Sequence, residues 1–271
     1  ISSVSTVDAS EIKNIPVTNI TQGLAGRSPG LIVQASGGGV NKTSQISIRG
    51  GETPLAVIDG IIRAYNDFVA LSPDDIENLA ILKDASATAV YGSRAANGIL
   101  QVTTKRGKLG SKPMVEYNFN QSFSQPNIWP KKLNSYDRAY YMNFAAKSDG
   151  LSTLPFSDDD LNKFKDGSDP FGHADVDWQS LVLKDYAPQQ KHNIKMSGGS
   201  ETNNYFVSLG YIDQGSLYRN DSHEMQRTNF RLNQSSVVKA IGLKTTAQID
   251  GYVQETTHPY TSTSNSYYNV F

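Results

Sequence analysis

The sequence has no cysteine, no excess charge of either sign and no long apolar run. The lack of cysteine excludes disulfides, thiol nucleophiles and cysteine-ligated metals. Lysine and arginine together number 25, and aspartate and glutamate 26, which gives a formal net charge of −1. A chain so balanced has no general electrostatic attraction for nucleic acid, so we expect no nucleic-acid partner. No segment approaches the roughly 18 apolar residues that a membrane-spanning helix requires.

Recognisable catalytic motifs are also missing. Ser93 stands in Gly92-Ser93-Arg94 and not in the G-x-S-x-G elbow of hydrolases. The few histidines are scattered, and none begins a metal-binding or nucleophile motif. We therefore expect that the protein is not an enzyme and has no catalytic or metal-ligating residues. The four histidines are His173, His192, His223 and His258.

A group of aspartates between residues 158 and 177 is the one candidate for a cation site. Hard cations such as calcium prefer several oxygen ligands, but the spacing does not match an EF-hand. We favour ordinary solvated loop residues and expect no cofactor, with calcium as the alternative. The aspartates are Asp158, Asp159, Asp160, Asp166, Asp169, Asp175 and Asp177.

The chain is rich in tyrosine (14), phenylalanine (10) and glycine (22), a mixture of strand formers and turn formers that predicts a β-rich fold. Residues 1–107 combine short helix and strand signals with closely spaced glycines, which indicates a small α+β domain. Asn19 is expected to cap a helix over 20–25. Strands are expected at 45–49, 55–58, 79–82 and 99–105, and an alanine-rich helix from Asp84 to Tyr91.

Beyond Lys112 the apolar residues recur with a period of two, in segments of about the 9–11 residues that a tilted strand needs to cross a bilayer. In the segment around residue 230, Thr228, Phe230 and Leu232 share one face, and charged or amide side chains share the other. A soluble sandwich also alternates, but its inner face is filled with apolar atoms. Charges on the inner face of successive strands therefore favour the first antiparallel strands of a transmembrane β-barrel over residues 108–271.

The connections between these strands alternate between long and short. Outer-membrane barrels have long extracellular loops and short periplasmic turns, so the first link, from about residue 125 to 188, is expected to be extracellular. It is too long to be featureless. We expect a helix from Ser135 to Lys147, and a second apolar-acidic stretch from Asp158 to Phe164.

Four spaced motifs resemble one family. They are IPVTNITQGLAGRSPGLIV at 15–33 with the glycines at 37–39, ISIRGG at 46–51, PLAVIDG at 54–60, and LSPDDIENLAILKDASATAVYGSRAANGILQVTTKRG at 71–107. Their order and their residues resemble the plug domain of SusC/RagA-type TonB-dependent outer-membrane transporters. The form KDASATAVYGSRAANG is typical of that branch. The resemblance is strong over about residues 1–135 and rests on strand pattern beyond them.

The resemblance implies a barrel of about 22 strands when complete, occluded by the plug in the bacterial outer membrane. It also implies TonB-dependent import of a nutrient together with a SusD-like surface lipoprotein. The cargo is expected to be an oligosaccharide, with a peptide as the second candidate. The hydrophobic TonB box expected before the plug is absent, and the expected strands are too few to close a barrel. We therefore expect this chain to be an N-terminal portion of a longer one.

Five charged residues are candidates for fastening the plug to the polar barrel wall by charge-assisted bonds. The alternative is exposed charges of little energetic consequence. The candidates are Arg49, Glu77, Lys83, Asp84 and Arg94.

Five other residues are candidates for substrate contact, because aromatic rings beside amides suit sugar rings. Four are expected in a loop after Ile61-Ile62, where plug–barrel packing is the alternative role, and one lies in the long first loop, where it could instead anchor the loop. They are Tyr65, Asn66, Asp67, Phe68 and Trp129.

A different class of protein also fits parts of the pattern, namely a secreted β-rich carbohydrate-binding or adhesion protein without transport. It predicts a fold complete within these residues and solubility without detergent.

Overall fold

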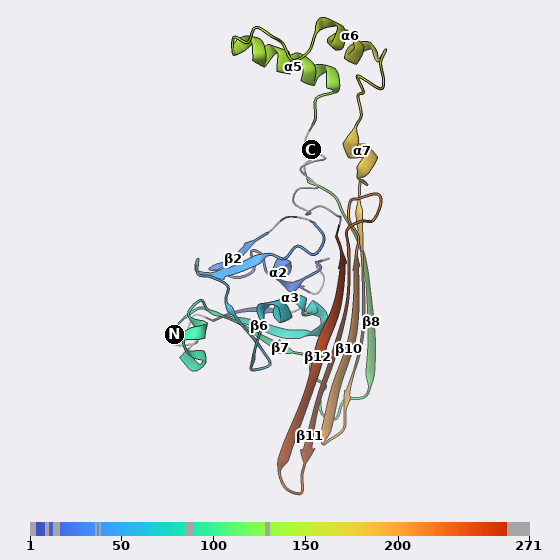
Figure 1. The fold of residues 1–271 in the computed structure, drawn as a ribbon. Coiled ribbons are helices and arrows are strands. Elements are labelled where there is room, and N and C mark those ends of the chain that lie inside the picture. Colours follow the sequence, from blue (N-terminus) through green and yellow to red (C-terminus); the bar gives the residue numbers. More distant parts are fainter. Residues whose placement is uncertain are drawn as a thin grey trace. The chain divides into compact units, whose positions relative to one another are not determined.

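The computed structural model describes residues 4–8, 11–12, 17–35, 37, 39–84, 89–127 and 131–258. It divides into two compact units, which we describe separately. The first comprises residues 1–124, 186–216 and 221–257, and the second residues 125–185, 217–220 and 258–271. The first unit contains an N-terminal α+β domain, here called the plug, and a five-stranded sheet, here called the wall (Figure 1).

The plug is built on a mixed sheet with the strand order β1-β6-β7-β4-β5, in which only β4 and β7 pair in parallel. A separate antiparallel pair, β2–β3, completes it. The strands are β1 (Val4–Asp8), β2 (Leu31–Gln34), β3 (Gln45–Ile48), β4 (Leu55–Ile58), β5 (Ile61–Arg63), β6 (Ile76–Leu82) and β7 (Ile99–Thr104).

Short helices connect the plug strands. Asn19 caps α2 (Ile20–Gly23) as expected, accepting a hydrogen bond from the Gln22 amide at 3.3 Å. The prediction of a loop at residues 65–68 is wrong, because these residues begin helix α3 (Tyr65–Ala70). The 3-10 helices are η1 (Pro73–Asp75) and η2 (Ala89–Ala95). Part of the expected alanine-rich helix, residues 85–88, lies outside the described residues.

One apolar core runs through the plug and supplies its own stability. Phe68 and Ile20 are fully buried in it, together with Leu79 and Leu100 from the central strands. Burial of a side chain of this size contributes about 1.5–3 kcal/mol. A smaller cluster around Val57 and Ile99 packs on the other side of the sheet. The plug therefore does not depend on the wall for a hydrophobic core.

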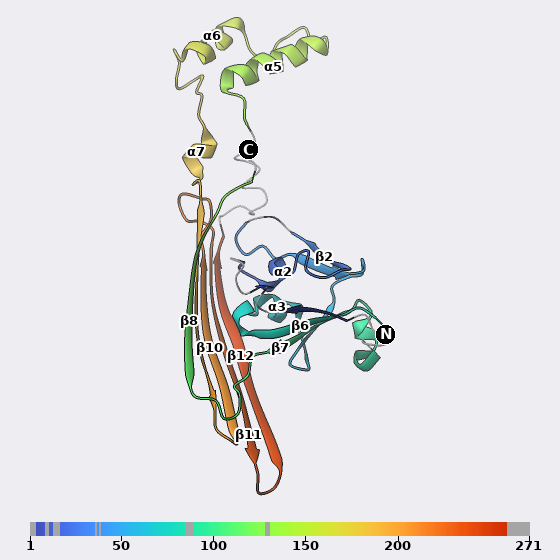
Figure 2. The ribbon, with the colours of Figure 1, turned by 180° about the vertical axis from the view of Figure 1, so that it is seen from behind.

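The wall is an antiparallel meander in the order β12-β11-β10-β9-β8, each strand paired with its sequence neighbour (Figure 2). Its strands are longer than those of the plug. They are β8 (Met114–Ser124), β9 (Ala187–Gly199), β10 (Asn203–Gln214), β11 (Glu224–Val238) and β12 (Leu243–Thr257). The observed plug and antiparallel strands confirm the β-rich fold class predicted from the sequence, and β8 and β12 form the two sheet edges.

Cross-strand register places apolar side chains in rows on the outer face of the wall. Phe230 pairs with Leu209 on one side and with Gly251 on the other, so its ring lies against a glycine that leaves room for it. A polar row follows these rows toward the loop end of β10. The outer rows are Val115-Met196-Val207-Leu232-Ile249, Tyr117-Ile194-Leu209-Phe230-Gly251 and Phe119-His192-Tyr211-Thr228-Val253, and the polar row is Gln121-Gln190-Asp213-Gln226-Glu255.

The second unit contains three helices from the long first loop, α5 (Ser135–Ser148), α6 (Asp158–Asp166) and α7 (Trp178–Val182). The expected helix at Ser135 is confirmed, and the apolar-acidic stretch forms α6, whose capping box joins Ser157 and Asp160. Helix α7 was not expected. Among the described residues, the helices are too short or too polar to serve as membrane spans.

Candidate functional site

The inner face of the wall carries buried cations. Lys191 and Lys195 lie on β9, and Arg231 lies on β11, with exposed fractions of 8%, 4% and 3%. Successive side chains of a strand point to opposite faces, so residues four apart share one face. Charges buried this deeply require partners. Three of those partners, Asp59, Asp74 and Asp75, come from the plug, and two, Glu116 and Asp250, from the wall itself.

Asp74 is the plug's main contact to the wall lysines. Its carboxylate lies 2.7 Å from Lys191 Nζ and 3.6 Å from Lys195 Nζ. Glu116 on β8 adds a second acid 3.2 Å from Lys195. The local sequence explains the backbone at Asp74, because Pro73 starts the short helix η1 and the two aspartates follow in its first turn.

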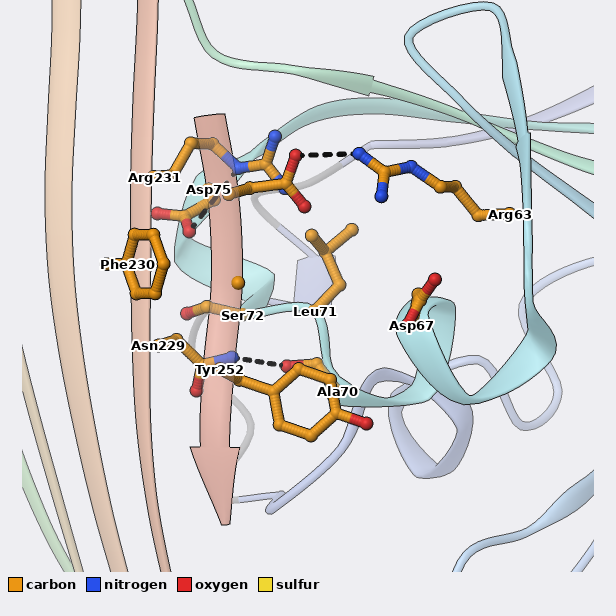
Figure 3. A pocket seen from close by; sticks show the side chains of 12 residues that line it. Arg63, Asp67, Ala70, Leu71, Ser72, Asp75, Asn229, Phe230, Arg231 and Tyr252 are labelled. Carbon is orange, nitrogen blue, oxygen red and sulfur yellow. Dashed lines mark hydrogen bonds and ion pairs between the residues drawn. The ribbon is translucent and has the colours of Figure 1, made fainter. Parts of the chain in front are cut away.

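Arg231 lies between three carboxylates. It is 3.7 Å from Asp59, 3.8 Å from Asp75 and 3.7 Å from Asp250. Figure 3 shows Arg231 and Asp75 facing each other beside a cavity. Asp59 is held in place by Thr104, whose backbone amide and hydroxyl both donate to its carboxylate, at 2.9 and 2.6 Å.

Asp74 and Asp75 differ in their electrostatics although they are adjacent. Burial raises the pKa of Asp74, but the charges of Lys191 and Lys195 outweigh it, and the net shift is downward. Burial also raises the pKa of Asp75, and a hydrogen bond to Ser208 and the charge of Arg231 offset this only in part, so its pKa stays above the ordinary value. Asp74 is therefore the acid that the wall holds in its charged form.

Strand β11 also binds the plug backbone through Arg227, Asn229 and Asn233, which lie on the same face as Arg231. Arg227 donates to the carbonyl of Thr18. Asn229 Nδ2 donates to the Ala70 carbonyl at 2.7 Å, a contact drawn in Figure 3. Asn233 Nδ2 donates to the Lys105 carbonyl at 2.7 Å. These side chains donate hydrogen bonds to main-chain carbonyls of the plug and so hold it in one register against the wall.

Two cavities lie between plug and wall within the first unit. The charged cavity, about 240 Å³, is the one in Figure 3. It is lined by Arg63, Asp67, Ala70, Leu71, Ser72, Asp75, Asn229, Phe230, Arg231, Asp250, Gly251 and Tyr252. The amide cavity, about 250 Å³, is lined by Thr18, Asn19, Asn41, Thr43, Asn66, Val69, Ala70, Met225, Arg227, Tyr252 and Gln254.

Three of the fastening candidates join plug segments to each other. Arg49 lies 2.7 Å from Asp84 and donates to the Lys83 carbonyl at 3.3 Å. Lys83 Nζ donates to Ser5 Oγ at 2.7 Å and to the Pro29 carbonyl. These contacts tie the β3 end to the β6 end and to strand β1. Contact of these residues with further barrel strands stays a prediction.

The other two fastening candidates, Glu77 and Arg94, are exposed on the plug surface, and their predicted role also stays untested. Asp59, Asp74 and Asp75, the plug acids that meet the wall, were not predicted from the sequence. Each has a local role that accounts for it: Asp59 stands in an Asp-Gly turn, and Asp74 and Asp75 stand at a helix start. Nothing in their local sequence therefore indicates a distant partner. The sequence feature that could have located this site is the set of cations on one face of the wall strands β9 and β11.

The substrate candidates fall in different environments. Phe68 is fully buried in the plug core. Tyr65 is partly buried, its hydroxyl donates to the Ser44 carbonyl, and burial raises its pKa to about 12. Asn66 lines the amide cavity and Asp67 the charged one. Trp129 lies outside the described residues.

The N-terminal part of the chain matches a known domain family. Residues 1–99 match the family model described as TonB-dependent Receptor Plug Domain. This range contains every plug strand up to the start of β7.

Curated relatives extend the similarity across the wall strands. The chain is 33% identical over 264 residues to TonB-dependent receptor P26 of Formosa agariphila, covering 89% of this chain and 26% of the relative. It is 34% identical over 248 residues to TonB-dependent receptor SusC of Bacteroides thetaiotaomicron, covering 87% and 22%. The chain thus spans about a quarter of the length of these relatives.

Solved structures show the same fold. The RagAB peptide importer in its closed-closed state superposes with a TM-score of 0.77 at 27% identity, covering 96% of this chain and 31% of that one. The unliganded ferric citrate transporter FecA superposes with a TM-score of 0.58 at 10% identity, covering 95% and 32%, which shows a shared fold alone.

Plug, wall and comparisons together define the chain as part of a TonB-dependent receptor. Within that class it belongs to the SusC/RagA type, as its motifs predicted, and comprises the plug and the first barrel strands. The relatives are named as receptors and importers, not as enzymes.

Proposed function

We propose that the whole protein imports a nutrient across the bacterial outer membrane by TonB-dependent transport, and that the plug gates the barrel lumen. The proposed cargo is an oligosaccharide, and a peptide is the second candidate because one structural relative is titled a peptide importer. The solute would pass intact, without covalent chemistry or a cofactor. Calcium binding by the acidic first loop stays a hypothesis.

The observation that carries this proposal is the polar seam between plug and wall. Asp59, Asp74 and Asp75 meet Lys191, Lys195 and Arg231 there, and β11 amides bind plug carbonyls. Ion pairs and amide contacts can be exchanged for water, whereas an apolar interface would expose hydrophobic surface when it opened. Because the plug has its own core, it can shift without unfolding.

An outer-membrane location is supported by the outer rows of the wall. The outward-facing side chains of β10 from Tyr205 to Tyr211 extend about 20 Å along the strand, comparable with the roughly 25 Å apolar band of outer-membrane barrels. Tyrosines stand at both ends of the band, and Asp213 lies in the polar row beyond it. We propose that the long first loop, about residues 125–188, is extracellular, and that the plug domain spans residues 1–107.

The proposed partners are TonB, which supplies the energy from the inner membrane, and a SusD-like surface lipoprotein. TonB is supported by the names of the relatives, and the lipoprotein by the SusC/RagA type of the chain. Tyr65, Asn66, Asp67 and Trp129 stay our candidates for cargo contact within the described plug and the first loop. Phe68 would act by positioning α3, since its ring is buried.

The test is uptake by cells that produce the whole protein. Fluorescent neutral and acidic oligosaccharides and a peptide library are offered to wild-type cells, to cells without the transporter gene, and to cells without TonB. We expect import of at least one cargo class that disappears in both deletions. A protein recovered without detergent in the medium, with no import, would favour a secreted binding or adhesion protein instead.

A further inference from the structure

Arg227 is a buried charge without an acidic partner. Its side chain lies on the inner face of β11, and the residue is 2% exposed. Across the described part of the chain, no carboxylate comes within the 4.0 Å that defines an ion pair to it. A buried guanidinium that lacks a counter-charge is costly. The position of Arg227 therefore calls for an anion.

The other buried cations of the wall make this absence informative. Arg231 lies four residues further along the same strand and on the same face, is equally buried, and has three carboxylates within 4.0 Å. Lys191 and Lys195 both pair with Asp74. Among these four cations, Arg227 alone has only a neutral contact, the Thr18 carbonyl.

Part of the guanidinium is still available for hydrogen bonding. Arg227 has five N–H donors in a planar fork, and Nη2 donates to Thr18. Its Nε is buried and makes no hydrogen bond with any described residue. The residue lines the amide cavity, so an anionic oxygen in that cavity would lie beside a full positive charge.

The rest of the cavity lining favours a sugar. It consists mainly of hydroxyl and amide side chains from both plug and wall, including Thr43, Asn66, Tyr252 and Gln254, and it contains no carboxylate. Such groups pair with hydroxyls. At about 250 Å³ the cavity is smaller than the roughly 300–1,000 Å³ of pockets for drug-sized ligands. It fits one residue of a longer cargo.

We infer that Arg227 binds the acidic group, a carboxylate or a sulfate, of an anionic oligosaccharide in the amide cavity. This inference rests on the proposed function, because it assigns the charge of the cargo. The competing source of the anion is a carboxylate elsewhere in the whole protein, and a peptide carboxylate is a second competitor. The experiments below separate the three.

The first experiment measures the melting temperature of the purified whole protein with either arginine replaced. Arg231→Met removes the cation that three carboxylates share and leaves Asp75 without an ion pair among the described residues, so it is expected to lower Tm clearly. Arg227→Met removes a charge that has no acidic partner, so it is expected to lower Tm by less than half as much. A fall of half or more would show that the protein supplies the counter-charge itself, and would overturn the inference.

The second experiment measures binding of trigalacturonate, its methyl ester and a tripeptide to the same proteins. We expect wild type to bind the acid about 10- to 100-fold more tightly than the ester, the effect of a charge-assisted hydrogen bond. Arg227→Met is expected to bind acid and ester equally. An undiminished preference in Arg227→Met, no preference in wild type, or tighter binding of the tripeptide than of the acid would overturn the inference.

Uptake distinguishes failure of this inference from failure of the proposed function. If cells import neutral and acidic oligosaccharides alike, and Arg227→Met changes neither, the transporter assignment stands and the anion site is wrong. If no oligosaccharide or peptide is imported by wild type, the proposed function itself fails. Preferential import of acidic oligosaccharide, lost in Arg227→Met, supports both.

Discussion

Adjacent aspartates in the plug have opposite electrostatic environments. Asp74 meets two lysines, and its pKa is lowered despite burial. Burial raises the pKa of Asp75, and the ion pair between Asp75 and Arg231 is long, at 3.8 Å. By linkage, the stabilisation from Asp74 is present above its ordinary pKa of 3.8 and is lost as the pH falls through the lowered value. Asp75 contributes with the opposite sign, since its raised pKa favours the protonated form.

The first prediction follows from this difference. Asp74→Asn leaves Lys191 and Lys195 buried with too little negative charge, and removal of one partner of a buried pair costs about 3–5 kcal/mol. Asp75→Asn removes a carboxylate that is already disfavoured, and is expected to cost about 1 kcal/mol or less. Hydrogen exchange of the plug in the whole protein measures both. An equal or larger loss for Asp75→Asn would contradict the account.

A histidine clasp in the first loop predicts a pH dependence. His173 lies 2.9 Å from both Asp160 and Asp169. Hydrogen bonds to Asp160 and then Asp169 raise the pKa of His173 above 6.5, and its bond to Asp160 helps lower the pKa of that acid to about 2. The His173 contribution is therefore complete below pH 6.5 and is lost as the pH rises through the raised pKa. The Asp160 contribution is complete above pH 3.8 and is lost toward pH 2.

We expect hydrogen exchange in residues 158–173, corrected for its intrinsic pH dependence, to be slowest at about pH 4–6.5 and to increase above that range. In His173→Gln the increase on the alkaline side should disappear. Exchange that is independent of pH in the wild type, or equally dependent in the variant, would show that the clasp does not order this segment.

At the scale of elements, period and composition predicted the long wall strands, and turn signals predicted the plug strands β3, β4, β6 and β7, but other short elements were missed. The wall strands were read from alternation, because burial of one face imposes a period of two over many residues. Strands β1, β2 and β5 and helix α3 were missed, since segments of three to six residues carry too little pattern. Phe68 is fully buried, so tertiary packing decides the conformation there. Likewise, the cations of the site were visible on a strand face, but their partners Asp59 and Asp74 are distant in sequence.

The junction between plug and wall predicts a strict glycine. Gly107 passes beneath the β9–β10 turn, where an added Cβ would lie 2.5 Å from the Gly198 carbonyl and also against the backbone of Tyr205. These are main-chain atoms, so Gly107→Ala is expected to destabilise the protein by about 1–3 kcal/mol or more. Gly39→Ala is the control, because its Cβ meets only the Lys42 side chain at ordinary distance. Denaturation measures both, and equal stabilities would contradict this packing.

At the scale of the whole molecule, the account holds that the plug moves against the wall when solute passes. The plug has a hydrophobic core of its own. The seam that joins it to the wall consists mainly of ion pairs and amide hydrogen bonds, with one small apolar contact of Val40 with Ile212 and Met225. Sequence motifs were sufficient to identify the plug and its family. They did not reveal which of its charges lie in the seam, because that depends on the docking of two elements.

The most direct test of this account is to lock the seam reversibly. The chain has no cysteine, so Ala70→Cys with Asn229→Cys, whose parent residues are joined by a 2.7 Å hydrogen bond, gives a single thiol pair in this region. A short methanethiosulfonate cross-linker joins the pair in cells producing the whole protein, and each single-cysteine variant treated alike is the control. The account predicts that import stops on cross-linking and returns on reduction. Unchanged import through the fully cross-linked protein would contradict it.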